Sequence, residues 1–355
     1  FCDAVVRGPP SFTLPAGSSM DLWSPEFASA TSIPAGTLSL QLFADAPAPA
    51  LDGSAAGAWS SGSTFTIGSF STTKANDVVL LSIGTYVSGA SVTVSSVTDS
   101  LGKISWQASA RNSFVSCPAS EETTHIEWYG IASTVVPSDT ITVRLSSTPA
   151  AAIGIAFGVS GADTVTPFDP ASGLPATATG GCTGTAVTPT VPAVSTVADT
   201  DLVFAFFGGS SSEAETAGNI GTGGATLVDS VTTSGNDAVE YATTTTSQSS
   251  DSCTFGASGT YWGALCDALM PARQTIAVSY HATNSAGTVQ STMASASPAT
   301  ITALYQPVSI PSSAGTVPAS GYVEVVITGP AGAALTVYWG TPKPTLFEVT
   351  YAYRA

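Results

Sequence analysis

Hydrophobic and small polar residues alternate in short runs along almost the whole chain. Runs such as 78–83, 140–145 and 322–327 are rich in β-branched or aromatic residues and are bounded by Gly, Pro, Asp or Ser. This period of two is typical of β-strands, and no stretch of a dozen residues has the helical period. Strand-like runs that recur every 8 to 12 residues or so predict an all-β protein built from packed sandwiches.

The length of 355 residues favours two or three domains, because a single core seldom grows that large. Within residues 60–272 the pattern repeats weakly. The strand pair 64–70 and 77–86 is echoed by 190–197 and 201–207, each pair with a polar turn between its strands. We expect residues 60–272 to form one large sandwich with an internal pseudo-repeat.

Four segments of this central stretch carry a family resemblance. They are VTDSLGK at 97–103, IEWY at 126–129, VSGADTVTPFD at 159–169 and WGALCDAL at 262–269. In these segments and in their order, the stretch resembles a sandwich module of secreted bacterial and archaeal surface proteins. The resemblance implies a fold and an extracellular location, and it implies no particular chemistry.

The flanking segments carry a second pattern. IPAGTLSLQLF at 33–43 precedes the central stretch, and VSYHATNSAGTVQ at 278–290, GYVEVVITGP at 321–330 and LTVYWG at 335–340 follow it. Together they are similar to archaeal extracellular structural and filament-type proteins. We therefore expect residues 11–59 and 273–355 to form one discontinuous jelly-roll or Ig-like sandwich, with 60–272 inserted at a loop. Three domains in series is the alternative.

Composition narrows the function classes. Charged residues are only 9% of the chain, and 8 basic against 24 acidic side chains give a net charge of −16. Without a basic stripe, a nucleic-acid partner is not expected. No run of 18 apolar residues predicts a membrane-spanning helix. The acidic balance suits solubility or an acidic habitat, and the start at Phe1 without Met fits a mature secreted protein as well as it fits a trimmed chain.

Five cysteines lack the spacing of a zinc site. In a secreted protein we expect two disulfides among Cys117, Cys182, Cys253 and Cys266, with the pairing left open. Cys2 would then be free to reach another subunit. The alternatives for Cys2 are a buried thiol and a bond to another cysteine of the same chain.

Catalytic chemistry has few candidates, so no enzyme activity, metal or cofactor is predicted. His125 and His281 lie in strand-like runs, and no nucleophile elbow accompanies the many serines. Carboxylates that come in pairs, as glycosidases need, are expected to be solvated loop residues, apart from Glu127 in its apolar run. Possible calcium ligands match no dedicated loop. The carboxylates considered are Glu121, Glu122, Glu127, Glu213, Glu215, Asp163, Asp169, Asp199 and Asp201.

The first ten residues suggest an assembly device. Residues 1–7 read as a short strand, separated from the body by the stiff spacer Gly8-Pro9-Pro10. A detached strand of this kind can complete the sheet edge of a neighbouring subunit. Its inter-subunit candidates are Phe1, Cys2, Ala4, Val5 and Val6. The alternative is that the segment pairs within its own chain.

The predicted function is therefore a secreted structural protein that binds copies of itself, as the subunit of a filament or surface layer. A carbohydrate-binding module or adhesin for surface glycans is the alternative, and a glycoside hydrolase is a third reading. Sugar binding would use exposed aromatic rings. The tryptophans considered are Trp23, Trp59, Trp128, Trp262 and Trp339, of which the last three lie in apolar runs typical of a core.

Overall fold

The computed structural model is all-β, as predicted, with no helix among the residues it describes. It describes residues 2–4, 11–15, 17–24, 26–33, 38–41, 44–45, 48–87, 91–118, 123–198, 200–209, 214–233, 235–272, 274–295, 299–301, 313–329, 335–340, 343–344 and 346–349. In this part of the chain no helix is present that could cross a bilayer.

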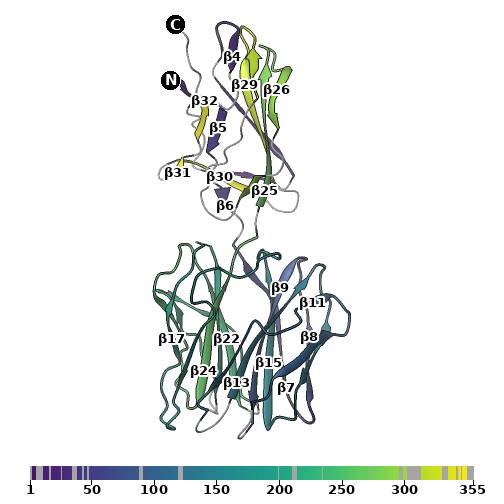
Figure 1. Cartoon of the computed structure of the whole chain (residues 1–355), viewed down its shortest axis with the longest axis vertical. Helices are drawn as coiled ribbons and strands as arrows, with labels where there is room; N and C mark the ends of the chain where they lie inside the picture. Colours follow the sequence, from purple (N-terminus) through teal and green to yellow (C-terminus); the bar gives the residue numbers. More distant parts are fainter. Residues whose placement is uncertain are drawn as a thin grey trace. The chain divides into compact units, whose positions relative to one another are not determined.

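The chain divides into two compact units (Figure 1). The smaller unit comprises residues 1–47 and 272–355, and the larger unit comprises residues 48–271. The sequence analysis predicts that residues 48–59 belong to the smaller unit, together with the segments that flank the central stretch. Strand β7 (Ala50–Ala58) instead pairs with β15 (Ala151–Ser160) of the larger unit. A strand rich in Ala and Gly gives little hydrophobic signal in the sequence, because these residues have small side chains or none. Its pairing in the sheet depends on backbone hydrogen bonds.

The described strands of the larger unit form four sheets. Sheet 1 has the order β10-β14-β8, sheet 2 β11-β13-β9-β15-β7 with β12 on β13, sheet 3 β16-β24-β18-β22-β21, and sheet 4 β17-β23-β19-β20. The bounds are β8 (Thr64–Phe70), β9 (Asp77–Tyr86), β10 (Val94–Asp99), β11 (Ile104–Trp106), β12 (Asn112–Ser116), β13 (Thr123–Ala132), β14 (Asp139–Leu145), β16 (Ala176–Gly180), β17 (Thr190–Val194), β18 (Leu202–Gly209), β19 (Asn219–Ile220), β20 (Gly223–Gly224), β21 (Thr226–Val231), β22 (Asn236–Thr243), β23 (Asp251–Thr254) and β24 (Trp262–Leu269).

Three hydrophobic clusters join these sheets face to face. The first combines residues of sheets 1 and 2, such as Phe65 and Trp128. The second combines residues of sheets 2 and 3, such as Phe157 and Phe204. The third combines residues of sheets 3 and 4, such as Phe207. Sheets 2 and 3 are thus covered on both faces, which explains why their inner strands are continuous apolar runs. We call the side chains between sheets 2 and 3 the central layer.

The two halves of the larger unit repeat one topology. Strands β13-β9-β15-β7 in sheet 2 and β22-β18-β24-β16 in sheet 3 follow the same order, with β9 and β18 at equivalent places. The sequence echo noted above falls on β8 and β9 and on β17 and β18. The same supersecondary unit is therefore built twice and packed against itself.

Side-chain hydrogen bonds repeat as well, at the turn that enters each of these strands. Before β9, the hydroxyl of Thr72 donates to the carbonyl of Lys74 at 3.2 Å and accepts from the amide of Val136 at 3.1 Å. Before β18, the hydroxyl of Thr196 donates to the carbonyl of Ala198 at 3.3 Å and accepts from the amide of Gln248 at 2.9 Å. Each of the two turns is thus fixed by its own buried threonine.

A carboxylate holds each of these turns from the other side. Asp52 accepts the amides of Thr73 and Lys74 at 2.9 and 2.7 Å. Asp169 accepts the amides of Val197 and Ala198 at 2.8 and 2.9 Å. Backbone donors that would otherwise be unsatisfied are thereby paired.

The smaller unit is built by pairing strands from the two ends of the chain. Strand β3 pairs with β29, β2 with β30, β4 with β28 and β5 with β32. Its bounds are β1 (Cys2–Ala4), β2 (Ser11–Leu14), β3 (Ser19–Trp23), β4 (Thr31–Ile33), β5 (Leu38–Gln41), β6 (Ala44–Asp45), β25 (Gln274–Thr283), β26 (Val289–Ser295), β27 (Ala299–Ile301), β28 (Gly315–Val317), β29 (Tyr322–Thr328), β30 (Leu335–Gly340), β31 (Lys343–Pro344) and β32 (Leu346–Val349).

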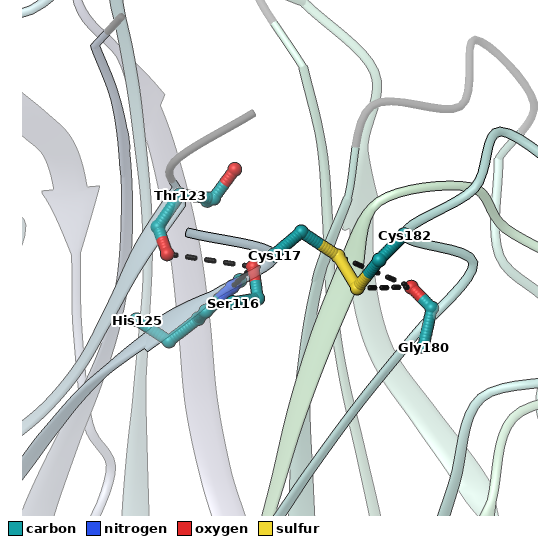
Figure 2. The surroundings of a disulfide bond; sticks show 6 residues. All are labelled: Ser116, Cys117, Thr123, His125, Gly180 and Cys182. Atoms are coloured by element: carbon teal, nitrogen blue, oxygen red, sulfur yellow. Dashed lines mark hydrogen bonds between the residues drawn. A yellow bond between two sulfur atoms is a disulfide. The ribbon is translucent and has the colours of Figure 1, made fainter. Parts of the chain in front are cut away.

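Both expected disulfides are present. Cys117, just after β12, bonds to Cys182 beyond β16, and so links sheet 2 to sheet 3 (Figure 2). Cys253 of β23 bonds to Cys266 of β24, and so links sheet 4 to sheet 3. The carbonyl oxygen of Gly180 lies 3.5 Å from Sγ of Cys117. This is a contact and not a hydrogen bond, because a disulfide sulfur carries no proton.

We expect the two disulfides to contribute unequally to stability. Cys117 and Cys182 are 65 residues apart, and Cys253 and Cys266 are 13 apart. Loop-closure entropy then predicts a loss of about 4 kcal/mol for the double alanine variant of the first pair and about 3 kcal/mol for that of the second. Denaturant unfolding of the two variants measures the difference. A larger loss from the shorter loop would show that packing around the sulfurs outweighs loop entropy.

Candidate functional site

The N-terminal strand lies at a sheet edge of its own chain. Strand β1 pairs antiparallel with β32 through Cys2↔Val349, Asp3↔Glu348 and Ala4↔Phe347. Phe1, Val5, Val6 and the spacer lie outside the described residues. The single chain thus shows the alternative in which this segment pairs internally, and pairing between subunits stays a prediction.

The contact that holds β1 is small. It has three residue pairs, and β1 is the outer strand of the order β1-β32-β5. Backbone hydrogen bonds supply the pairing, and any strand of matching register can supply the same bonds. This edge is therefore the candidate site of assembly.

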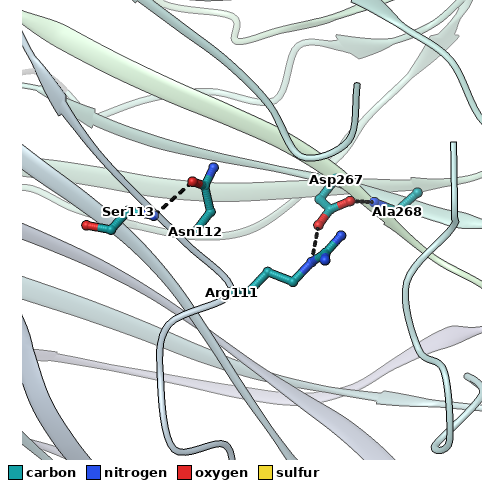
Figure 3. A network of polar contacts seen from close by, with 5 residues as sticks. All are labelled: Arg111, Asn112, Ser113, Asp267 and Ala268. Carbon is teal, nitrogen blue, oxygen red and sulfur yellow. Dashed lines mark hydrogen bonds and ion pairs between the residues drawn. The ribbon is translucent and has the colours of Figure 1, made fainter. Parts of the chain in front are cut away.

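A second site lies inside the central layer of the larger unit. Asp267 of β24 and Glu127 of β13 have no exposed surface. Nε of Arg111 donates to Oδ2 of Asp267 at 3.0 Å, and the amide of Ala268 donates to Oδ1 at 2.9 Å (Figure 3). The guanidinium carbon of Arg111 lies 3.9 Å from the ring centroid of Phe168, in cation–π geometry.

One cation faces two buried carboxyl groups in this cluster. Burial, and then the charge of Asp267, raises the pKa of Glu127 well above its usual value. Burial also raises the pKa of Asp267 to about 6, against the lowering effect of Arg111. Two ionised carboxylates are both acceptors, so a hydrogen bond between them exists only while one holds a proton. The cluster is neutral when that proton is present.

A buried histidine lies farther along the same layer. Nε2 of His125 is 3.0 Å from Oγ of Ser116 (Figure 2). The imidazole ring also stacks on Phe114, with centroids 5.0 Å apart. Burial lowers the pKa of His125 to about 3, so the ring is neutral over most of the pH range. A Cβ at Gly208 would lie 2.6 Å from His125, so only glycine fits opposite the ring.

Ser116 and His125 do not form an accessible catalytic pair. Ser116 has no exposed surface, and its hydroxyl also donates to the carbonyl of Thr123 at 3.4 Å. A substrate would have to reach a nucleophile enclosed by two sheets. The pair instead satisfies two polar groups in the core.

Further carboxyl groups lie close together elsewhere in the larger unit. Burial and the neighbouring Asp52 raise the pKa of Asp77 to about 7. Burial raises the pKa of Glu240 to about 7, and the charge of Glu215 adds to the effect. Glu215 is only 2% exposed, so its prediction as a solvated loop residue was wrong. Its Oε2 accepts the amide of Ala257 at 3.1 Å, which fixes the loop.

Two of the carboxylates considered for calcium accept backbone amides instead. Asp163 accepts the amides of Val165 and Thr166 at 2.8 and 3.1 Å. Asp169 holds the turn before β18, and Asp201 is fully buried at the start of that strand. No metal-binding group of side chains is found among the described residues. Glu121, Glu122, Asp199 and Glu213 lie outside them.

The tryptophans do not gather on one surface of the larger unit. Trp128 and Trp262 are buried, as their apolar runs indicated, and Trp59 packs against the first cluster. Trp23 is 38% exposed in the smaller unit, and the side chain of Trp339 lies outside the described residues. An aromatic platform for sugars is therefore not assembled by the described tryptophans.

His281 is a strand residue, in keeping with its sequence interpretation. In β25 its Nε2 lies 2.8 Å from the hydroxyl of Ser279, and its Nδ1 lies 3.2 Å from that of Thr292. Both hydrogen bonds are to hydroxyl groups, and Glu324 of β29 lies opposite His281 in the sheet. The contact with Thr292 joins β25 to β26.

The sequence reading missed Arg111, Ser116, Asp237 and Asp267. The available signal was a charged residue inside a run that otherwise reads as buried, as in WGALCDAL. Charged side chains are rarely fully buried unless they are paired or neutralised. Such a residue therefore signals a partner, although it does not identify one.

Comparison with known proteins gives no indication of the function. No family model, curated protein or solved structure matches the chain. The resemblance to secreted prokaryotic surface modules accordingly stays a prediction from the sequence.

We predict that the larger unit is most stable in acid. Asp267, Asp77, Glu240 and Asp237 have pKa values raised to about 6, 7, 7 and 8, against about 4 in an unfolded chain. Between those limits the folded state binds more protons, so the free energy of unfolding falls as pH rises from about 4 to about 8. His125 opposes this trend below about pH 6.5, as one group against four. Calorimetric Tm values across this range test the sign, and a Tm that rises toward pH 8 would contradict it.

We predict that removing the positive charge of Arg111 lowers the free energy of unfolding of the larger unit. Arg111→Met leaves Asp267 without its cation, and the loss of one partner from a buried pair costs about 3 to 5 kcal/mol. The matched control is Arg144→Met, because Arg144 is exposed on β14 and should change stability little. Urea unfolding at about pH 7 compares the two variants. Equal losses would show that the ion pair does not matter to folding.

Proposed function

We propose that this chain is an extracellular structural subunit that assembles with copies of itself. Both units are β-sandwiches of jelly-roll or Ig-like type, with the larger inserted into the smaller. The observation that carries the proposal is the three-residue pairing of β1 with the edge of β32. In the polymer, β1 of one subunit occupies this edge on the next.

Exchange of β1 costs little backbone energy. The strand makes the same hydrogen bonds within a chain and between chains, so the balance depends on the connection to the body. Residues 8–10, Gly-Pro-Pro, form a stiff connection that favours extended geometry. Head-to-tail repetition of one such contact yields a filament unless the rotation closes a ring.

Other features support a role outside the cell. Two disulfides link neighbouring sheets, and such bonds persist in oxidising compartments. The surface carries few charges, and the 24 acidic residues exceed the basic ones threefold. Of the two serine–histidine contacts described, Ser116 with His125 is enclosed in the core and Ser279 with His281 lies within strand β25, where both residues fit a structural role.

Deleting residues 1–8 tests the assembly. We expect a truncated protein with an unchanged Tm for the larger unit that stays monomeric in size-exclusion chromatography and shows no filaments by negative stain. A synthetic peptide of residues 1–8 should bind the truncated protein, because the β32 edge is vacant.

Cys2→Ser is the matched control for this deletion. It keeps the strand and removes the thiol, so it should assemble as the unaltered chain does. If the truncated protein forms the same polymers, strand exchange is wrong. If Cys2→Ser alone abolishes assembly, the contact is a disulfide and not a β-strand.

A further inference from the structure

A cavity opens at one end of the central layer. Its volume is about 390 Å³, and it is lined from both sheets, by β9 and β15 of sheet 2 and by β18 and β22 of sheet 3. This size is at the small end of the range for ligand sites. Its lining residues are Gly84, Thr85, Tyr86, Thr123, Ala150, Ala151, Ile153, Gly209, Gly235, Asn236 and Asp237.

Glycines create this space. A Cβ at Gly84 would lie 2.5 Å from Oδ2 of Asp237, so a larger residue would displace the carboxyl group. Gly235 has a φ of 128°, which side chains other than glycine rarely adopt. A larger residue at Gly84 or Gly235 would therefore disturb β9 or β22.

Asp237 is a polar group that the fold itself does not satisfy. It is 4% exposed, and its Oδ2 has no hydrogen-bond partner among the described residues. The amide of Gly84 donates to the carboxyl group. Both Asp237 and His125 lie beside Gly208, since a Cβ there would be 2.7 Å from Oδ1 of Asp237 and 2.7 Å from Nδ1 of His125. A buried polar atom without a partner is costly unless a ligand or water completes it.

The lining specifies an uncharged ligand. Among the described residues of the lining, Asp237 has the single carboxyl group, and burial raises its pKa to about 8, so below that pH it is a neutral hydrogen-bond donor. A cation would require the carboxylate form. Thr123 adds a hydroxyl group, and Ile153 adds an apolar wall. The hydroxyl of Thr85 donates to the carbonyl of Val92, and Asn236 lies on the face of β22 that packs toward sheet 4, so these two residues line the cavity with their backbone.

We propose that this cavity binds a small neutral saccharide, with a sugar hydroxyl completing the hydrogen bonding of Asp237. The hydroxyl groups and the apolar ring face of a sugar match a lining that combines the carboxyl group of Asp237 and the hydroxyl of Thr123 with Tyr86 and Ile153. The proposal is independent of the β1 edge, because every lining residue belongs to the larger unit.

Calorimetry and saturation-transfer NMR on the full chain at about pH 5 test the site, with the Asp237 carboxyl protonated. The probes are the methyl glycosides of glucose, mannose and galactose, together with N-acetylglucosamine. We expect at least one probe to bind. Ala150 is exposed at the cavity, so Ala150→Trp should abolish binding without altering the fold.

Two more variants make the result specific. Ala75→Trp is the matched control, because Ala75 is exposed in the turn at the opposite end of β9 and should leave binding unchanged. Asp237→Ala should weaken binding by about tenfold, as expected for one lost hydrogen bond in a buried site. Circular dichroism checks that each variant is folded.

Three outcomes would overturn the proposal. One is that no probe binds the unaltered chain. Another is that Ala150→Trp, correctly folded, binds as well as Ala75→Trp does, which would place the sugar elsewhere. The third is that tetramethylammonium binds and no saccharide does, which would show an ionised Asp237 and a cation site. None of these results would bear on assembly through β1.

Discussion

Everything in the larger unit depends on how charge is neutralised between sheets 2 and 3. The central layer is closed by Phe157, Phe204 and their neighbours, so an ionised group there cannot be solvated. Yet Glu127, Asp267 and Asp237 all face into it, and Arg111 is the cation beside the first two. Bound protons replace the missing cations, which ties the packing of the two halves to the acidity of the medium.

This solution agrees with the composition of the chain. With 8 basic side chains for 24 acidic ones, few buried carboxyl groups can pair with a cation, and the others must be satisfied by backbone amides or by protons. Asp52 and Asp169 use the first way, each accepting two amides of a turn. Asp77 and Glu240 use the second, because their burial raises the pKa to about 7. The acidity that the sequence suggested as a surface property is thus also a property of the core.

Short-range pattern was sufficient to predict the all-β class, the strand segments 77–86 and 201–207 and the participation of four cysteines in disulfides. The prediction failed where the hydrophobic pattern was weak, or where a contact joins residues that are far apart in the sequence. Strand β7 lacks the bulky residues that mark a strand, so the unit boundary was placed twelve positions late. Arg111 and Asp267 are 156 residues apart, and no local period reveals that they meet. Burial of Glu215 likewise depends on a distant loop, through Ala257.

The proposed assembly edge lies in the smaller unit and the proposed ligand cavity in the larger one, and the two sites use different interactions. Assembly through β1 uses backbone hydrogen bonds, which do not themselves titrate, although the register places the two acidic residues Asp3 and Glu348 opposite each other. Ligand binding in the larger unit uses a carboxyl group whose proton is lost as pH rises through about 8. If both proposals hold, acidity would change the stability and the ligand affinity of the larger unit without changing the backbone hydrogen bonds at the β1 edge. The cavity is lined by the larger unit alone, so this response would not have to pass through the contact between subunits.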